Sequence, residues 1–222
     1  MMTNLFSTFD PATSMKLSMN WISSLTCIIV LPQLYWLTPS RMNYINNNLM
    51  INLNKEFKLL MKSNESMSLM MIALFMMILM NNMLGLLPYV FTSSSHLVFS
   101  MTLSLSLWIA LMIYGWMNNT NEMFAHMIPL GTPPILMPFM VLIETISNII
   151  RPGSLAVRLT ANMIAGHLLM SLLGGNSSNM ENIMITFMMF MQTILMMFET
   201  AVALIQAYVF SVLSTLYTSE VM

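Results

Sequence analysis

Arg151-Pro-Gly-Ser-Leu-Ala-Val-Arg158-Leu-Thr-Ala-Asn162-Met-Ile-Ala-Gly166-His167 is the stretch of this chain that decides its fold. It places Arg158 inside a long run of apolar and small residues typical of a membrane-embedded helix. A guanidinium keeps its proton in a protein, and at the centre of a bilayer it costs roughly 2.5–3.5 kcal/mol on insertion scales. A chain that keeps such a charge there is predicted to use it.

Composition supports a membrane protein. Of the 222 residues, 57% are hydrophobic and 7% are charged, and the mean hydropathy is +0.76. A soluble domain usually carries about 25% charged residues, so this chain cannot cover itself with polar surface. The net charge of -1 argues against nucleic-acid binding, and the single cysteine, Cys27, excludes an internal disulfide.

The uncharged runs predict an all-α membrane protein with about five membrane-embedded helices. Residues 17–40 are expected to form one span, kinked at Pro32, and 66–91 and 96–117 a helical hairpin. The last third predicts two long helices, 135–172 and 180–218. At 1.5 Å per residue each is close to 60 Å long, about twice the hydrocarbon thickness. They are therefore expected to be a strongly tilted or bent hairpin.

Residues 42–62 have a different pattern, because apolar residues recur at helical spacing among Asn, Lys and Glu. This predicts an amphipathic helix on a membrane surface, although a solvated helix would look similar. Four of the seven basic residues fall in this connection: Arg41, Lys55, Lys58 and Lys62. The positive-inside rule then puts it inside, the N-terminus outside and, after five spans, the C-terminus inside.

Polar residues in the long helices predict two offset aqueous pathways. An ideal helix advances 100° per residue, so Asn162 lies about 40° from Arg158, and Glu144 about as far if Pro152 keeps the phase. His167 lies about 180° away. Glu144 is about 21 Å along the helix on the inner side of Arg158, and His167 about 13 Å on the outer side. Titratable groups thus flank a permanent cation.

The last helix carries a second stripe, at Glu199, Ala203, Gln206 and Phe210. Structural roles are the alternative. Arg158 would then neutralise Glu199 or Glu144, His167 would be a hydrogen-bonded core residue, and Asn162 and Gln206 would join neighbouring helices.

Three segments together resemble the subunit a family of rotary ATP synthases, in its mitochondrial form, over nearly the whole chain. They are Ser154–His167, Glu199–Phe210 and the run from Asn82 to Tyr89. The resemblance implies a stator beside a ring of c subunits, each carrying one membrane carboxylate. It implies that Arg158 faces those carboxylates and blocks leakage. It also assigns Asn162, His167, Glu199 and Gln206 to the proton entry channel, and Glu144 to the exit.

The resemblance further implies a multi-pass protein of the mitochondrial inner membrane. Its N-terminus would lie in the intermembrane space and its C-terminus in the matrix. Its expected partners are the c-ring, other membrane and peripheral-stalk subunits, protons and lipid. Bacterial relatives carry an acid where His167 stands and a histidine where Glu199 stands, which suggests that the two interact. A hairpin bend near 182 would bring them together, whereas one near 176 would place Glu199 deeper.

No cofactor or metal is expected, and there is no Gly-x-x-x-x-Gly-Lys phosphate loop, so ATP chemistry is assigned to other subunits. Two other functions compete with a stator. One is a stand-alone transporter or ion channel, which would require a complete conduction path in one chain. The other is a structural scaffold, which predicts that Arg158 tolerates a neutral replacement.

Overall fold

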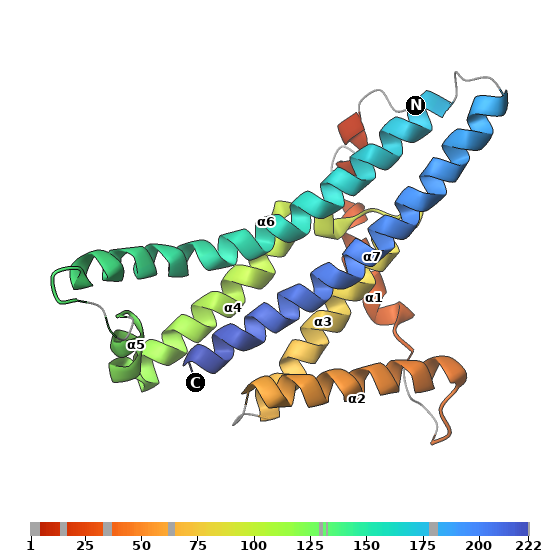
Figure 1. Ribbon diagram of the computed structural model, residues 1–222. Helices are drawn as coiled ribbons and strands as arrows, with labels where there is room; N and C mark the ends of the chain where they lie inside the picture. The colour runs from red at the N-terminus through yellow and green to blue at the C-terminus, as the bar shows by residue number, and fades with distance from the viewer. Residues whose placement is uncertain are drawn as a thin grey trace.

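Figure 1 shows the computed structural model, which describes residues 5–13, 17–32, 37–61, 65–128, 131, 133–177 and 182–221. Every element within these ranges is a helix. In chain order they are η1 (Leu5–Phe9), η2 (Met19–Ile22), α1 (Ser23–Val30), α2 (Arg41–Met61), α3 (Glu65–Gly85), η3 (Ser93–Ser95), α4 (Leu97–Asn118), α5 (Thr120–His126), α6 (Met137–Ser177) and α7 (Asn182–Val221).

Four of these helices contain apolar stretches long enough to cross a membrane: Met67–Gly85, Leu97–Asn118, Met137–Ser177 and Met184–Val221. A shorter apolar helix covers Met19–Val30. The expected fold class, an all-α membrane protein with about five embedded helices, is confirmed.

The first helix is shorter than the span expected over 17–40. It ends at Val30, and Leu31 is extended, with φ -62° and ψ 121°. Pro32 is the reason, because a proline clashes with a helical conformation in the residue before it. The proline expected to kink the helix therefore ends it. Residues 33–36 of the expected span lie outside the described residues.

The first hairpin also differs from the expected bounds, since α3 ends at Gly85 and not at 91. Pro88 follows three residues later, and Tyr89 has a positive φ of 66°. A proline ring removes a backbone donor and cannot continue a helix. Asn81 and Asn82 at the end of α3 are buried, so this end of the helix faces the protein interior.

The two long helices, α6 and α7, have 41 and 40 residues, slightly more than the expected ranges 135–172 and 180–218. Figure 1 shows them side by side near the turn that joins them, and diverging further away. Pro152 lies inside α6, where it removes one hydrogen bond and favours a bend. α4 packs against α6, and α3 packs against α7.

Buried side chains from α3, α6 and α7 form the central core, which contains Phe75, Met76, Ile78, Leu155, Leu159, Ala207 and Phe210. A second cluster fixes α2 across the end of α3, and contains Phe57, Met61, Met71 and Ile72. α2 keeps most of its other residues exposed, as expected of an amphipathic surface helix.

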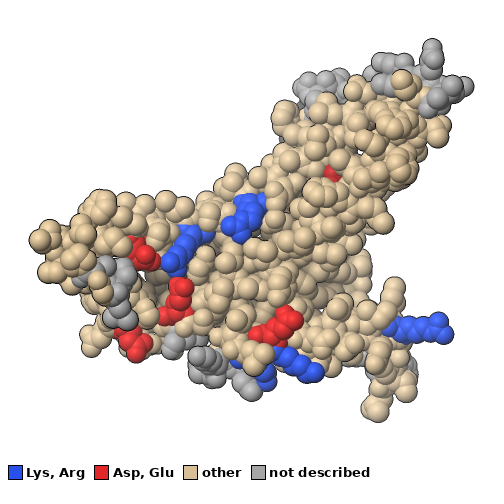
Figure 2. Space-filling model, viewed as in Figure 1, with Lys and Arg blue, Asp and Glu red and all other residues tan. Residues whose placement is uncertain are grey.

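The ends of the molecule differ in which connections they hold. Figure 1 shows the N-terminal segment and the α6–α7 turn at one end, and α2, α5 and the C-terminus at the other. Figure 2 shows charged side chains gathered over α2 and over the half that holds α5, whereas the arm near the α6–α7 turn is almost free of them on this face.

Candidate functional site

One face of α6 carries Arg158 outward. Arg158, Ala161 and Ala165 are exposed, whereas Leu159 and Met163 on the other side are buried. No ion pair or hydrogen bond joins the Arg158 guanidinium to any described residue. The alternative in which Arg158 is neutralised by Glu199 or Glu144 is therefore not what the described structure shows. Small residues beside it let another helix approach closely.

Glu199 of α7 is buried against α6, with 8% of its surface exposed. A Cβ added at Gly166 would lie 2.9 Å from Glu199 Cδ and 2.9 Å from its Oε1. The glycine thus makes room for the carboxyl group directly beside His167. Among the described residues, both Glu199 carboxylate oxygens and His167 Nε2 are buried without a hydrogen-bond partner. Such groups are costly unless a proton or water satisfies them.

Contacts between the long helices set their register. Gly166 lies against Glu199, and Gly174 lies 3.9 Å from Gln192 Nε2 when its missing Cβ is added. Both pairs fit an antiparallel hairpin centred near 182, the register that brings His167 and Glu199 together. Extrapolated further, it sets Gln206 level with Arg158. The Glu199 stripe is on the packed side of α7, since Ala203 and Phe210 are 1% and 2% exposed.

A large cavity of about 1460 Å³ opens beside His167. We call it the His167 cavity. Its walls come from η1 and the residues after it, the connection after α3, and the turn-side halves of α6 and α7. Ser171, Gln192 and Thr193 give it hydrogen-bonding groups within a largely apolar wall. A cavity of this size has room for water, and these side chains supply groups to which water can hydrogen-bond.

Arg151 lies seven residues before Arg158 on α6 and has a different environment. Its Nη2 donates to Glu144 Oε1 at 3.1 Å and its Nη1 to Glu220 Oε2 at 2.9 Å. Its guanidinium also lies 5.1 Å from the centroid of the Tyr217 ring. The two carboxylates come from α6 and the end of α7, so the cluster ties the diverging helices together.

These groups line a second cavity of about 280 Å³, the Glu144 cavity, together with His126 at the end of α5. Arg158 lines neither cavity. It lies between them along α6, about 21 Å from Glu144 and about 13 Å from His167 at 1.5 Å per residue. The structure thus places a permanent cation between two separate cavities, each lined by at least one titratable side chain.

Sequence reasoning did not find Tyr217 and Glu220. Glu220 is one of eight acidic residues in a sparsely charged chain, which was a usable signal. Its contact with Arg151 spans 69 positions, so spacing within one helix did not reveal it. His126 also lines the Glu144 cavity. Asn162 and Gln206 are half-buried on α6 and α7.

The described residues contain no group of three His, Cys, Asp or Glu side chains arranged to hold a metal ion. What the fold and the cavities define is a polytopic helical membrane protein with titratable groups on both sides of an unpaired arginine. In such proteins intramembrane charges mark substrate or ion pathways and proton relays.

Comparison with known proteins gives the family. The pattern of the ATP synthase A chain family matches residues 14–219. ATP synthase subunit a of Drosophila simulans is 56% identical over 223 residues, that of Aedes aegypti 56% over 226 and that of Locusta migratoria 53% over 224, each covering 100% of both chains. The chain belongs to the ATP synthase A chain family, the proton-translocating stator subunit of the rotary enzyme.

Proposed function

We propose that Arg158 separates two proton half-channels that this chain presents to a rotating ring of c subunits. The observation that carries the proposal is the unpartnered, exposed guanidinium of Arg158 on a small-residue face. Although the guanidinium is exposed on this chain by itself, a membrane would surround it with lipid, where a cation without a counter-charge is strongly unfavourable. The missing counter-charge is a carboxylate on a ring subunit, which passes Arg158 as the ring turns.

The entry half-channel is the His167 cavity, with His167 and Glu199 at its inner end. Protons reach the ring past Glu199, Asn162 and Gln206. His167 is suited to the transfer because imidazole exchanges protons near neutral pH. Glu199 is suited because its unpartnered oxygens accept a proton without moving a permanent charge through lipid.

The exit half-channel is the Glu144 cavity. A ring carboxylate that has completed its turn meets Arg158 from the other side. Attraction to the guanidinium favours the ionised carboxylate, so the proton is released. Glu144 accepts it next to the fixed charge of Arg151.

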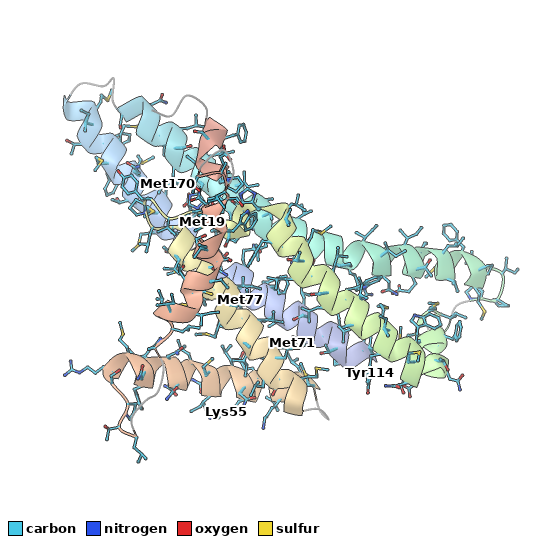
Figure 3. All side chains as sticks on the ribbon, turned by 180° about the vertical axis from the view of Figure 1, so that it is seen from behind. Met19, Lys55, Met71, Met77, Tyr114 and Met170 are labelled. Atoms are coloured by element: carbon cyan, nitrogen blue, oxygen red, sulfur yellow. The ribbon has the colours of Figure 1, made fainter. Side chains whose placement is uncertain are left out.

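The protein is a multi-pass component of the membrane sector of mitochondrial ATP synthase, consistent with its insect relatives and its apolar helices. We assign α2 and the C-terminus to the matrix side and the N-terminus to the intermembrane space. The basic residues of α2 support this assignment. In Figure 3, Lys55 of α2 and Met170 of α6 mark opposite ends of the molecule.

Lys55→Cys tests the sidedness in intact inner-membrane vesicles. An impermeant thiol reagent should label it from the matrix side alone. Buried Cys27 is replaced by Ser to remove background. Labelling only from the intermembrane space would reverse the assignment of both half-channels.

Arg158→Ala tests the function itself. Proton-driven ATP synthesis in reconstituted vesicles should fall by more than about 100-fold, the usual cost of losing one preorganised charge, while the complex still assembles. Normal synthesis would rule out the proposal and favour a structural scaffold. Proton conduction by the purified chain without ring subunits would favour a stand-alone channel.

A further inference from the structure

We propose that Asp10 is the proton-collecting carboxylate of the His167 cavity, and that the N-terminal segment is held over this cavity to deliver protons to His167. The inference rests on the proposed function, because it adds a residue to the entry half-channel. Neither the spacing of charges in the long helices nor the Arg158 motif involves this segment.

Contacts place the N-terminal segment at the cavity. η1 packs against α6, and the ring of Phe9, its last residue, meets the His167 imidazole edge-on. Their centroids are 6.3 Å apart and their planes are 79° apart. Asp10 follows directly, and both Asp10 and His167 line the same cavity.

Hydrogen bonds fix the backbone around Asp10 and leave its carboxylate accessible. The Ala12 N–H donates to Asp10 Oδ1 at 3.0 Å, and Asn20 Nδ2 donates to the Asp10 carbonyl oxygen at 3.2 Å. The residue is exposed. An ionised carboxylate has about four acceptor positions, so Asp10 still accepts protons or water. The backbone of Asp10 is thus fixed in position, whereas its carboxylate can still take up a proton.

Of the described residues that line the cavity, Asp10 is the one carboxylate, and none is Lys or Arg. The other titratable groups among these described residues are His167 and Tyr89. A single negative charge at an apolar cleft concentrates cations there. Hydronium or a protonated buffer gives a proton to Asp10, and water passes one to His167, so the carboxylate is ionised again after each transfer.

A purely structural role is the competing explanation, since Oδ1 accepts the Ala12 N–H. Asp10→Asn separates the two roles, because it keeps this acceptor and removes the titratable group. Asp10→Glu keeps the charge. Glu122→Gln is the matched control, as Glu122 is an exposed carboxylate on α5 that lines neither cavity.

The experiment measures ATP synthesis per assembled complex in vesicles, with the compartment facing the His167 cavity weakly buffered near neutral pH. Asp10→Asn should lower synthesis about three- to tenfold, at or below the bottom of the roughly 10- to 1000-fold range that electrostatic steering contributes. Acidifying that compartment, or adding impermeant MES to it, should restore the rate because a mobile acid replaces the missing one. Asp10→Glu should retain most of the rate, and Glu122→Gln should match the native enzyme.

Native synthesis by Asp10→Asn overturns the inference. So does equal loss in Asp10→Glu, or a loss that MES does not relieve, because each shows a structural role. If Asp10→Asn fails to assemble, Asp10→Ser replaces it, and failed assembly of both also overturns the inference. Arg158→Ala in the same preparation tells the two proposals apart. If Arg158→Ala abolishes synthesis while Asp10→Asn does not lower it, the proposed role of Asp10 is ruled out and the proposed role of Arg158 stands.

Discussion

Arg151 and Arg158 lie on the same helix, seven positions apart, in opposite surroundings. Arg151 is bound by Glu144 and Glu220 and lies over Tyr217. Arg158 is exposed beside alanines and has no partner in the described part of the chain. Both side chains carry the same permanent charge, so the difference comes from what the fold places around them.

The comparison teaches that this chain neutralises one cation by itself and leaves the other for a second protein. Removing one partner of a paired charge costs stability mainly through the charge left behind. Arg151 is therefore expected to matter for holding α6 to α7, and Arg158 for what approaches α6 from outside.

Giving Arg158 a charged partner within the chain should abolish the difference between the surroundings of Arg158 and those of Arg151. Asn162→Glu puts a carboxylate four positions after Arg158, where side chains on one helix face meet. Arg158 would then be occupied as Arg151 is, and ATP synthesis in vesicles should fall by more than about 100-fold. Asn162→Gln adds the same length without charge and should cost much less. Equal effects from the two changes would show that charge pairing is irrelevant.

Removing either member of the His167 and Glu199 pair should slow proton flux about 10- to 100-fold, at or below the usual range for one acid–base group. Because Glu199 packs against Gly166, the residue next to His167 in the chain, the effects of His167→Gln and Glu199→Gln should not add, with a coupling of at least about 0.5 kcal/mol. Proton flux through the double-mutant cycle measures this. The swap, His167→Glu with Glu199→His, should recover part of the loss. Strictly additive effects would mean that the two residues act separately.

Gly166→Ala should disturb the same site without changing any charge. Its Cβ would fall 2.9 Å from the Glu199 carboxyl carbon, and overpacking of this kind costs about 1–3 kcal/mol. We expect a lower dissociation temperature of the complex and a severalfold lower flux. Gly153→Ala is the matched control, because nothing lies within 4 Å of its added Cβ and alanine favours a helix. If Gly153→Ala lowered the proton flux as much as Gly166→Ala does, the cause would be a change in helix flexibility and not the contact with Glu199.

Arg151→Gln should have the smallest effect. Its partner Glu220 is 56% exposed, and ion pairs that reach the surface contribute about 0–1 kcal/mol. We expect the dissociation temperature to fall by a few degrees and part of the synthesis to be kept, in contrast to Arg158→Ala. Glu220→Gln should give a similar small shift. A loss as complete as that of Arg158→Ala would mean that the two arginines share one role.

The sequence by itself determined the class of fold and the cation at its centre. Only helices and closed barrels satisfy the backbone in lipid, and the long apolar runs of this chain have the length of membrane-spanning helices, not the roughly 9–11 residues of a barrel strand. The length of the last two helices and the position of Arg158 followed from the same runs. The helix ends beside prolines were less well predicted. Pro32 ended a helix that it was expected to kink, and α3 ended at Gly85, three residues before Pro88.

Only the tertiary structure decided which polar groups meet. The spacing within α6 separated His167 from Arg158, but the part of α7 that lies level with His167 depended on where the hairpin turns, and the contact of Gly166 with Glu199 gives that register. Glu220 reaches Arg151 across 69 positions, and Phe9 reaches His167 from the opposite end of the chain. Helical periodicity reports directions within one helix, whereas such contacts depend on how separate helices pack, so they were beyond the sequence.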